Sequence, residues 1–146
     1  MTTKYVPLIS SGVAGPLGVL HLPRLWLKAS LEALGKLADG YPGCGPGYDQ
    51  MVIDGLGLRR DAVLDFLKTQ RPTYPQFEAW IRQQPGVRLD AASIAKLNAA
   101  ITGYLHDDAT RQAILSANGL TDGPRDAVNL NNLDDWKEFH EAVLKG

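Results

Sequence analysis

Apolar residues recur every three or four positions along most of the chain, and glycine, proline and helix-capping residues separate these periodic segments. A helix with about 3.6 residues per turn brings such positions onto one face, so the spacing predicts amphipathic helices. Alternating apolar and polar runs of strand length do not occur in the sequence. The pattern therefore predicts the all-α class: a single compact helical domain over residues 1–146, with about seven helices and a Gly/Pro-rich loop after the first helix.

The first helix is expected to begin near Pro23, which is acceptable in a first turn, and to stop before Gly40. Apolar side chains cover most of its circumference. These side chains are Trp26, Leu27, Ala29, Leu31, Ala33, Leu34, Leu37 and Ala38. A helix that is apolar nearly all round is a central one, so this segment is predicted to lie in the middle of the domain.

A narrow polar stripe interrupts this apolar surface. Its residues are Arg24, Lys28, Glu32, Gly35 and Lys36. His21 extends the stripe if the turn before the helix continues the spiral, because it lies three residues before Arg24. Two interpretations stay open: a solvated seam in which Lys28 pairs with Glu32, or a cationic wall beside the loop that follows the helix.

Six further helices are expected, and most have a recognisable start or stop signal. Their expected ranges are 48–53, 60–68, 74–84, 91–105, 108–117 and 133–145. Thr73 and Gln76 fit a capping box, Asp90 is an N-cap residue, and Asp107 or Asp108 caps the sixth helix. The buried face of the last helix is expected to consist of Trp136, Phe139 and Val143.

The N-terminal segment, residues 1–20, mixes glycine and proline with apolar side chains. Its glycines and prolines predict an irregular arm rather than a helix. A free tail would be more polar, so the arm is expected to dock on the domain. The side chains that imply docking are Val13, Leu17, Val19 and Leu20.

Composition excludes several classes of protein. Hydrophobic residues make up 45% and charged residues 21% of the chain, which argues against disorder. The net charge of −1 argues against nucleic-acid binding by bulk charge. A single cysteine excludes an internal disulfide, and no apolar run approaches the ~18 residues of a membrane span. We therefore expect a cytoplasmic protein with neither a nucleic-acid nor a membrane partner.

The stretch Gly40–Asp49, here called the glycine loop, is the most constrained part of the sequence. Six of its ten residues are glycine or proline, and it contains the single cysteine, Cys44. Glycine admits backbone angles closed to other residues and proline fixes φ, so regular structure is excluded before the helix that starts near Tyr48. The loop is predicted to present Cys44 and Asp49 beside the first helix.

Cys44 is the first candidate for chemistry, because a thiolate is a nucleophile and its pKa falls near cations or a helix N-terminus. A constellation with Cys44 as nucleophile, His21 as base and Asp49 as orienting carboxylate is one hypothesis. The alternative is that Cys44 is a small buried hydrophobe, as lone cysteines usually are.

The glycine spacing Gly43-x-Gly45-x-Gly47 does not predict a phosphate or dinucleotide site. No strand precedes the loop, and Pro42 and Pro46 remove two amide donors. The histidines outside the loop region are far apart in sequence and form no metal-ligand spacing. No cofactor and no metal are predicted.

Two functions follow from these residues. In the preferred one, a small-molecule binding protein or enzyme has its pocket between the first helix and the glycine loop. There Arg24 and Lys28 attract a small anionic ligand, and Tyr41 and Tyr48 contribute rings and hydroxyls. The alternative is a helical protein–protein interaction module, or a homo-oligomer, without chemistry.

Several motifs together resemble a bacterial family that is catalogued as a domain of unknown function. They are GPLGVLHLPR at 15–24, CGPGYDQM at 44–51, PTYPQFEAW at 72–80, DAVNLN at 126–131 and LDDW at 133–136. The resemblance spans nearly the whole chain. It implies a small, single-domain, mostly helical bacterial protein, and it implies no known activity.

Overall fold

The computed structural model describes residues 3–146 and contains, within them, seven α-helices and one C-terminal π-helical turn. The elements are α1 (Leu22–Ala33), α2 (Tyr48–Leu56), α3 (Arg60–Gln70), α4 (Tyr74–Arg82), α5 (Ala91–Thr102), α6 (Asp108–Ala117), α7 (Ala127–Phe139) and η1 (His140–Leu144). Strand-like pairing in this range is limited to isolated bridges such as the one between Tyr5 and Leu37. The predicted all-α class is confirmed.

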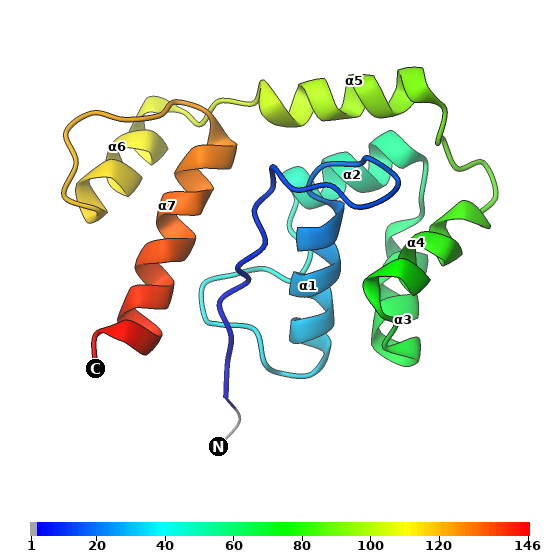
Figure 1. The fold of residues 1–146 in the computed structure, drawn as a ribbon, viewed down its shortest axis with the longest axis horizontal. Coiled ribbons are helices and arrows are strands. Elements are labelled where there is room, and N and C mark those ends of the chain that lie inside the picture. Colours follow the sequence, from blue (N-terminus) through cyan, green and yellow to red (C-terminus); the bar gives the residue numbers. More distant parts are fainter. Residues whose placement is uncertain (1–2) are drawn as a thin grey trace.

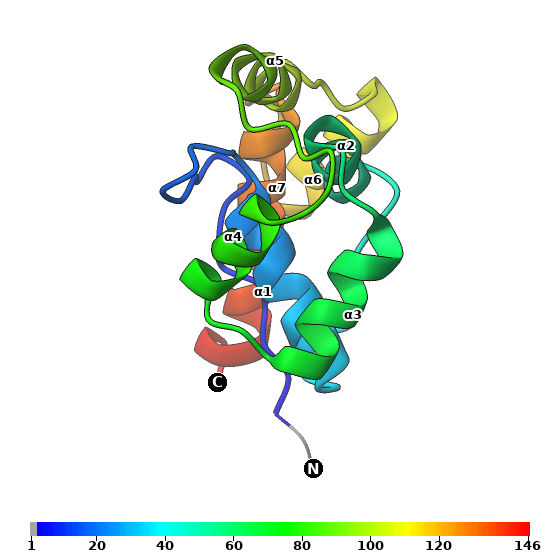
Figure 2. The ribbon, with the colours of Figure 1, turned by 90° about the vertical axis from the view of Figure 1, so that its right-hand side faces the viewer.

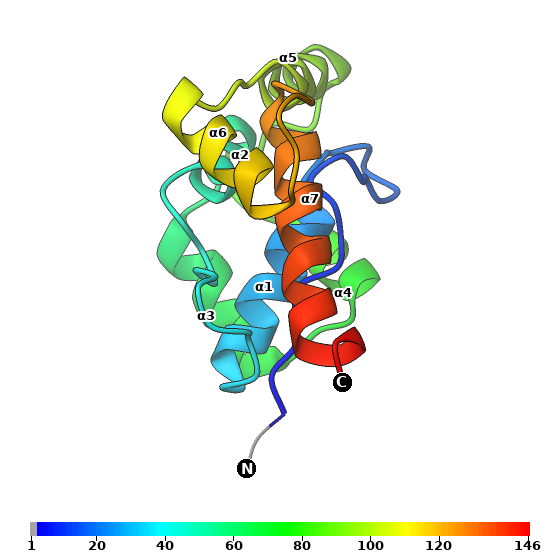
Figure 3. The same ribbon diagram turned by 90° about the vertical axis from the view of Figure 1, so that its left-hand side faces the viewer.

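Helix α1 occupies the centre of the domain, as its apolar circumference predicts (Figure 1). Helices α3 and α4 cover it on one side (Figure 2), and α7 runs along the opposite side, with α6 packed against α7 (Figure 3). Helix α5 lies across the top and packs on α2. In the view of Figure 1, the N-terminal arm and the glycine loop run between α1 and α7.

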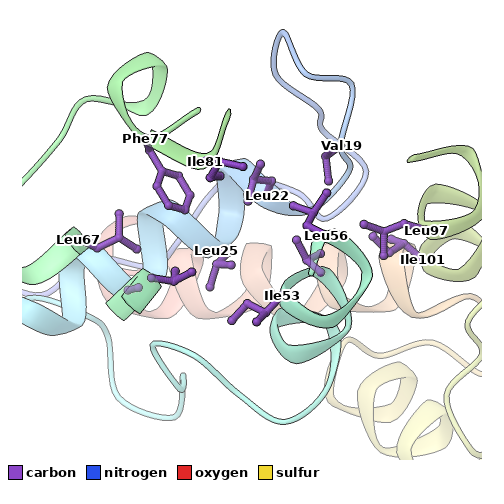
Figure 4. Close-up of a cluster of buried hydrophobic side chains, with 13 residues drawn as sticks. Val19, Leu22, Leu25, Ile53, Leu56, Leu67, Phe77, Ile81, Leu97 and Ile101 are labelled. Atoms are coloured by element: carbon purple, nitrogen blue, oxygen red, sulfur yellow. The ribbon is translucent and has the colours of Figure 1, made fainter. Parts of the chain in front are cut away.

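The hydrophobic core lies on the α3/α4 side of α1 and beneath α5 (Figure 4). Side chains from five helices meet there, and the fully buried ones include Leu22 and Leu25 of α1, Ile53 of α2, Phe77 of α4 and Ile101 of α5. Burying one such side chain contributes roughly 1.5–3 kcal/mol. The core therefore fixes α1 by one face and leaves its opposite face free for other contacts.

Capping residues start α4, α5 and α6 where the sequence predicts. Thr73 accepts a hydrogen bond from the Gln76 amide while Gln76 reaches back to the Thr73 amide, which completes the capping box of α4. Asp90 and Asp107 cap α5 and α6 in the same manner through one side-chain acceptor each. These local signals depend on few residues, which is why they could be predicted.

Helix α1 ends earlier than predicted. It stops at Ala33 because Gly35, with φ of 68°, adopts the left-handed conformation that ends helices. The following residues turn back, and Leu37 is buried beside the arm while Leu34 is 40% exposed. The prediction of one helix reaching Gly40 was wrong, since apolar spacing alone did not distinguish a continued helix from a buried turn.

Helix α7 begins earlier than predicted, and it buries a different face. Asp126 caps it by accepting from the Asn129 amide, so the helix starts at Ala127. This phase makes Asp135 buried at 3% exposure, whereas Trp136 is 60% exposed. The expected buried face of Trp136, Phe139 and Val143 was wrong, because the buried residues of α7 are Ala127, Leu130 and Asp135.

The N-terminal arm docks irregularly on the domain. Val19 is fully buried, and Leu17 and Leu20 are half-buried, whereas Val13 is exposed. Glu78 of α4 accepts hydrogen bonds from the Leu17 amide and so fastens the turn before α1.

Within residues 3–146, no helix has the length and hydropathy that a membrane span needs.

Candidate functional site

A cavity of about 590 Å³ lies between α1, the glycine loop, the start of α2 and α7. This is where the sequence predicts a pocket. One side of it, here called the ion-pair wall, consists of His21, Arg24, Lys28, Asp49 and Asp135. Each of these five residues is at most 6% exposed. Ionisable side chains are rarely buried to this degree unless they are paired, and here every one has a partner.

The polar stripe of α1 is therefore not a solvated seam. Lys28 donates to Asp49 Oδ2 across 2.6 Å instead of pairing with Glu32. Glu32 instead accepts from the Gly43 amide at 2.8 Å. The buried part of the stripe faces the glycine loop, as the second interpretation requires, but its cations Arg24 and Lys28 each contact a carboxylate, while Lys36 is exposed beyond the end of α1. It is a wall of neutralised pairs rather than a cationic wall.

Asp49 is the centre of the first pair. Its Oδ1 contacts His21 Nε2 at 2.6 Å, and its Oδ2 accepts from Lys28 Nζ and from the Gly45 amide at 2.7 Å. Burial alone would raise the pKa of Asp49, but the hydrogen bond from His21 and the charge of Lys28 outweigh it and lower the pKa. Asp49 therefore stays ionised and ties α1, the loop and α2 together.

His21 stays neutral between two fixed partners. Burial lowers its pKa, and the hydrogen bond and charge of Asp49, which favour the proton, do not overcome that effect. In the neutral ring Nε2–H donates to Asp49, so Nδ1 accepts from the Ser11 hydroxyl at 2.8 Å. Both ring nitrogens are thus engaged, and neither is free to take a proton from a bound substrate.

The backbone at His21 is also unusual. Its φ of 70° lies in the left-handed region, and it is the N-cap residue of α1. Histidine, asparagine and aspartate tolerate this conformation better than other non-glycine residues. The contacts of its side chain with Ser11 and Asp49 hold His21 in this conformation, so α1 begins beside the cavity.

Replacing His21 by Asn is expected to flatten the pH dependence of stability below neutrality. The pKa of His21 is lower in the folded chain than its value of about 6.5 in the unfolded chain. The contribution of His21 to the free energy of unfolding is therefore complete above that pH and is lost as the pH falls toward the folded pKa. The slope of this loss is at most about 1.4 kcal/mol per pH unit. Asn suits the left-handed backbone.

Urea unfolding between pH 7 and pH 5 measures this slope. The exposed His140 supplies the control, and His140→Asn is expected to keep the pH dependence of the wild type. Equal slopes for the wild type and His21→Asn would show that the ring does not titrate differently in the folded protein. Asp49 contributes separately at lower pH, because its lowered pKa is reached only below about 3.9.

Arg24 and Asp135 form the second pair and connect three segments. Arg24 Nη1 donates to Asp135 Oδ2 at 2.6 Å and to the carbonyl oxygens of Pro7 and Ile9, while Nη2 donates to Asp135 Oδ1 at 3.0 Å. The Tyr41 hydroxyl donates to the same Oδ1 at 3.0 Å. Burial and the Asp135 charge raise the pKa of Tyr41, so its hydroxyl remains a donor. This guanidinium fastens both the arm and α7 to α1.

Cys44 lies apart from the pair of His21 and Asp49. It is half-buried and does not line the cavity, and both nitrogens of His21 contact other side chains. Burial, and then the Asp49 charge, raise the pKa of its thiol, and Arg60 and Lys28 offset this only in part. The structure thus brings His21 and Asp49 together, as the constellation requires, but gives Cys44 no base and no lowered pKa.

The amides of the glycine loop are used within the protein. Glu32 accepts from Gly43 and Asp49 accepts from Gly45, so these donors are not offered to an anion. A side chain at Gly43 would overlap Glu32, which accounts for glycine at that position. Arg60, the first residue of α3, donates to the carbonyl oxygens of Cys44 and Gly45 and so ties the loop to α3.

The lining of the cavity also includes side chains that the sequence did not single out. Tyr48, which was expected there, donates its hydroxyl to the Ile101 carbonyl at 2.6 Å, and burial raises its pKa to about 12. Tyr104 packs against its ring. His106 contacts Asn131 Oδ1 at 3.0 Å. Additional lining comes from Asn131, Asp134 and Asp135 of α7.

One sequence signal could have found the α7 residues. Asp126 and Asn129 have the spacing of an N-cap and its third helical position, so a helix starting at Ala127 places Asn131, Asp134 and Asp135 three and four residues apart on one face. Ser11 had no such signal, because its contact with His21 depends on the path of an irregular arm.

Comparison of the chain with protein-family models and with curated proteins finds no match to either. The fold and the site are therefore interpreted from their own geometry.

Proposed function

We propose that the protein binds a small molecule in the cavity between α1, the glycine loop and α7. The observation that supports this most strongly is the ion-pair wall: five ionisable side chains, all buried, line one space of about 590 Å³. That volume is typical of ligand pockets, which combine apolar and aromatic lining with a few fixed polar groups.

Stability alone is a weak reason for such a wall. Removing two charges from water costs several kcal/mol per ion, and well-packed apolar residues of similar volume often stabilise a protein equally well or better. Perturbed ionisable groups in a cleft are more characteristic of functional sites. Here the pKa values of Asp49 and His21 are both lowered, which keeps the Asp49 carboxylate charged and the His21 ring neutral.

The geometry favours binding over catalysis. His21 has no free nitrogen, the thiol of Cys44 has a raised pKa and lies off the cavity, and Asp49 already accepts three hydrogen bonds. A nucleophile and a base within mutual reach, which covalent catalysis requires, are not assembled from the predicted residues. These groups instead form a rigid wall that can orient a ligand.

A variant that fills the cavity tests the proposal. Gly47 lines the cavity, and a Cβ atom there would meet no neighbour within 4 Å, but its φ of −89° and ψ of −116° lie outside the regions that other residues favour. Gly47→Leu should therefore lose about 1–3 kcal/mol of unfolding free energy through backbone strain and still fold, while ligands found by thermal-shift screening of metabolite-sized molecules lose at least about tenfold in affinity.

Ala95→Leu is the matched control, because Ala95 is exposed on α5 and does not line the cavity. It should leave the affinity of every screened ligand unchanged. Ligands that bind Gly47→Leu as tightly as they bind the wild type would show that they occupy another place, and the cavity would lose its assignment.

An interaction module or a homo-oligomer stays the alternative function. The end of α7 and the π-helical turn expose large apolar side chains, with Trp136 at 60%, Val143 at 59% and Leu144 at 64%. Exposed apolar groups of this size mark association surfaces when they are contiguous. Light scattering after size-exclusion chromatography, compared between the wild type and Trp136→Gln, tests self-association.

The bacterial family and the cytoplasmic location stay predictions.

A further inference from the structure

The lining of the cavity also contains aromatic side chains, whose chemistry differs from that of the ion-pair wall. Tyr48 and Tyr104 both line the cavity, and their rings meet edge to face with centroids 5.6 Å apart. The Tyr48 hydroxyl is engaged with the Ile101 carbonyl, and its pKa of about 12 keeps the ring uncharged at neutral pH. The faces of such rings carry negative electrostatic potential and attract cations.

Asp134 also lines the cavity, without a donor of its own. Among the residues that the structure describes, none donates a hydrogen bond to its carboxylate. Burial raises its pKa, and the charges of Glu138 and Asp135 raise it further. Such a carboxylate lies in a negative potential that Lys137 and Arg24 offset only in part. A positively charged group beside it would relieve that potential.

The charge of the whole lining has the same sign. Two lining side chains are cationic, Arg24 and Lys28, and both are paired with aspartates. Four lining side chains are aspartates, so the formal charge of the lining is −2 when its histidines are neutral. An anionic ligand, which the basic stripe alone suggests, would meet no cation that lacks a carboxylate partner.

Given the proposed binding function, we infer that the ligand is a small organic cation, an amine or a quaternary ammonium. Its charge lies against Asp134, and its apolar part lies against aromatic side chains that line the same cavity, such as Tyr48 and Tyr104. A carboxylate combined with aromatic faces is a recurrent way for proteins to hold such cations. The sign of the ligand charge is thus opposite to that expected from the stripe.

Three soluble probes of matched size and different charge test this inference. Benzylamine is cationic, benzyl alcohol is neutral and phenylacetate is anionic at neutral pH. Titrations of the ¹⁵N-labelled protein, followed by amide NMR shifts of Gly45, Gly47 and Asn131, report binding in the cavity up to tens of millimolar. Benzylamine is expected to bind about tenfold more tightly than benzyl alcohol, and phenylacetate more weakly than both.

Asp134→Asn should abolish the preference for benzylamine over benzyl alcohol while leaving the affinity for benzyl alcohol unchanged. This variant should fold, since the ionised form of Asp134 is disfavoured in the folded protein. Asp65→Asn, on an exposed part of α3, is the control and should keep the preference. Tyr104→Leu keeps an apolar side chain but removes the ring, and should lower the affinity for benzylamine several-fold.

The outcomes separate the two proposals. Cavity shifts of equal or greater strength with benzyl alcohol or phenylacetate would overturn the cationic ligand and leave the binding function standing. A preference for benzylamine that survives Asp134→Asn would also overturn it. If none of the three probes shifts the cavity resonances, the binding function is overturned together with the inference.

Discussion

Replacing Asp49 by Asn is expected to lower the free energy of unfolding by about 3–5 kcal/mol, because it leaves the Lys28 ammonium buried without its carboxylate. The same change removes the charged acceptor of His21 and of the Gly45 amide. Urea unfolding at neutral pH measures the loss. No other single substitution in the cavity breaks contacts from α1, the glycine loop and α2 together.

Asp61→Asn provides the control for Asp49→Asn. Asp61 pairs with Arg59 at 2.9 Å, but both side chains are more than 70% exposed, so the loss should be below about 1 kcal/mol. Adding Lys28→Met to Asp49→Asn removes the uncompensated charge, and the double variant should recover part of the loss. Strictly additive losses in this cycle would contradict the pairing.

Replacing Arg24 by Met is expected to cost a similar amount, about 3–5 kcal/mol, and to release the N-terminal arm. The substitution leaves Asp135 buried without a cation and removes the donors that hold the carbonyl oxygens of Pro7 and Ile9. The amides of Tyr5 and Val13, which bond to other backbone groups, should then exchange faster with deuterium.

Arg24→Lys distinguishes charge from geometry. Lysine keeps the positive charge but cannot make the bidentate contact with Asp135. We therefore expect the unfolding free energy of Arg24→Lys to lie between those of the wild type and Arg24→Met. Arg59→Met, on the exposed pair, should leave amide exchange in the arm unchanged. Arm protection that persists in Arg24→Met would show that apolar docking alone holds the arm.

The features that could be predicted from sequence depend on a few neighbouring residues. The capping box of Thr73 and Gln76 needs two hydrogen bonds and the N-cap of Asp90 needs one, in each case between residues three apart. The spacing of His21, Arg24 and Lys28 placed them on one face of α1 because helix geometry requires it. The pocket beside the glycine loop followed from that same spacing.

The features that could not be predicted depend on partners distant in sequence. Asp135 pairs with Arg24 across 111 residues, and no local pattern indicates that pair. Because the charged Asp135 shares the buried face of α7 with Ala127 and Leu130, apolar periodicity over residues 133–145 selected another face, which carries the exposed Trp136. The stripe of α1 was predicted to be a source of positive charge because the aspartates that pair with Arg24 and Lys28 are distant in sequence.

An X-ray structure of crystals soaked with benzylamine is the most direct test of the small-molecule site. We expect both ion pairs of the wall to be enclosed, with Lys28 against Asp49, and difference density for the probe beside Asp134 in the cavity. Density confined to other surfaces, or Lys28 turned out to bulk water with the space beside the glycine loop closed, would contradict the site.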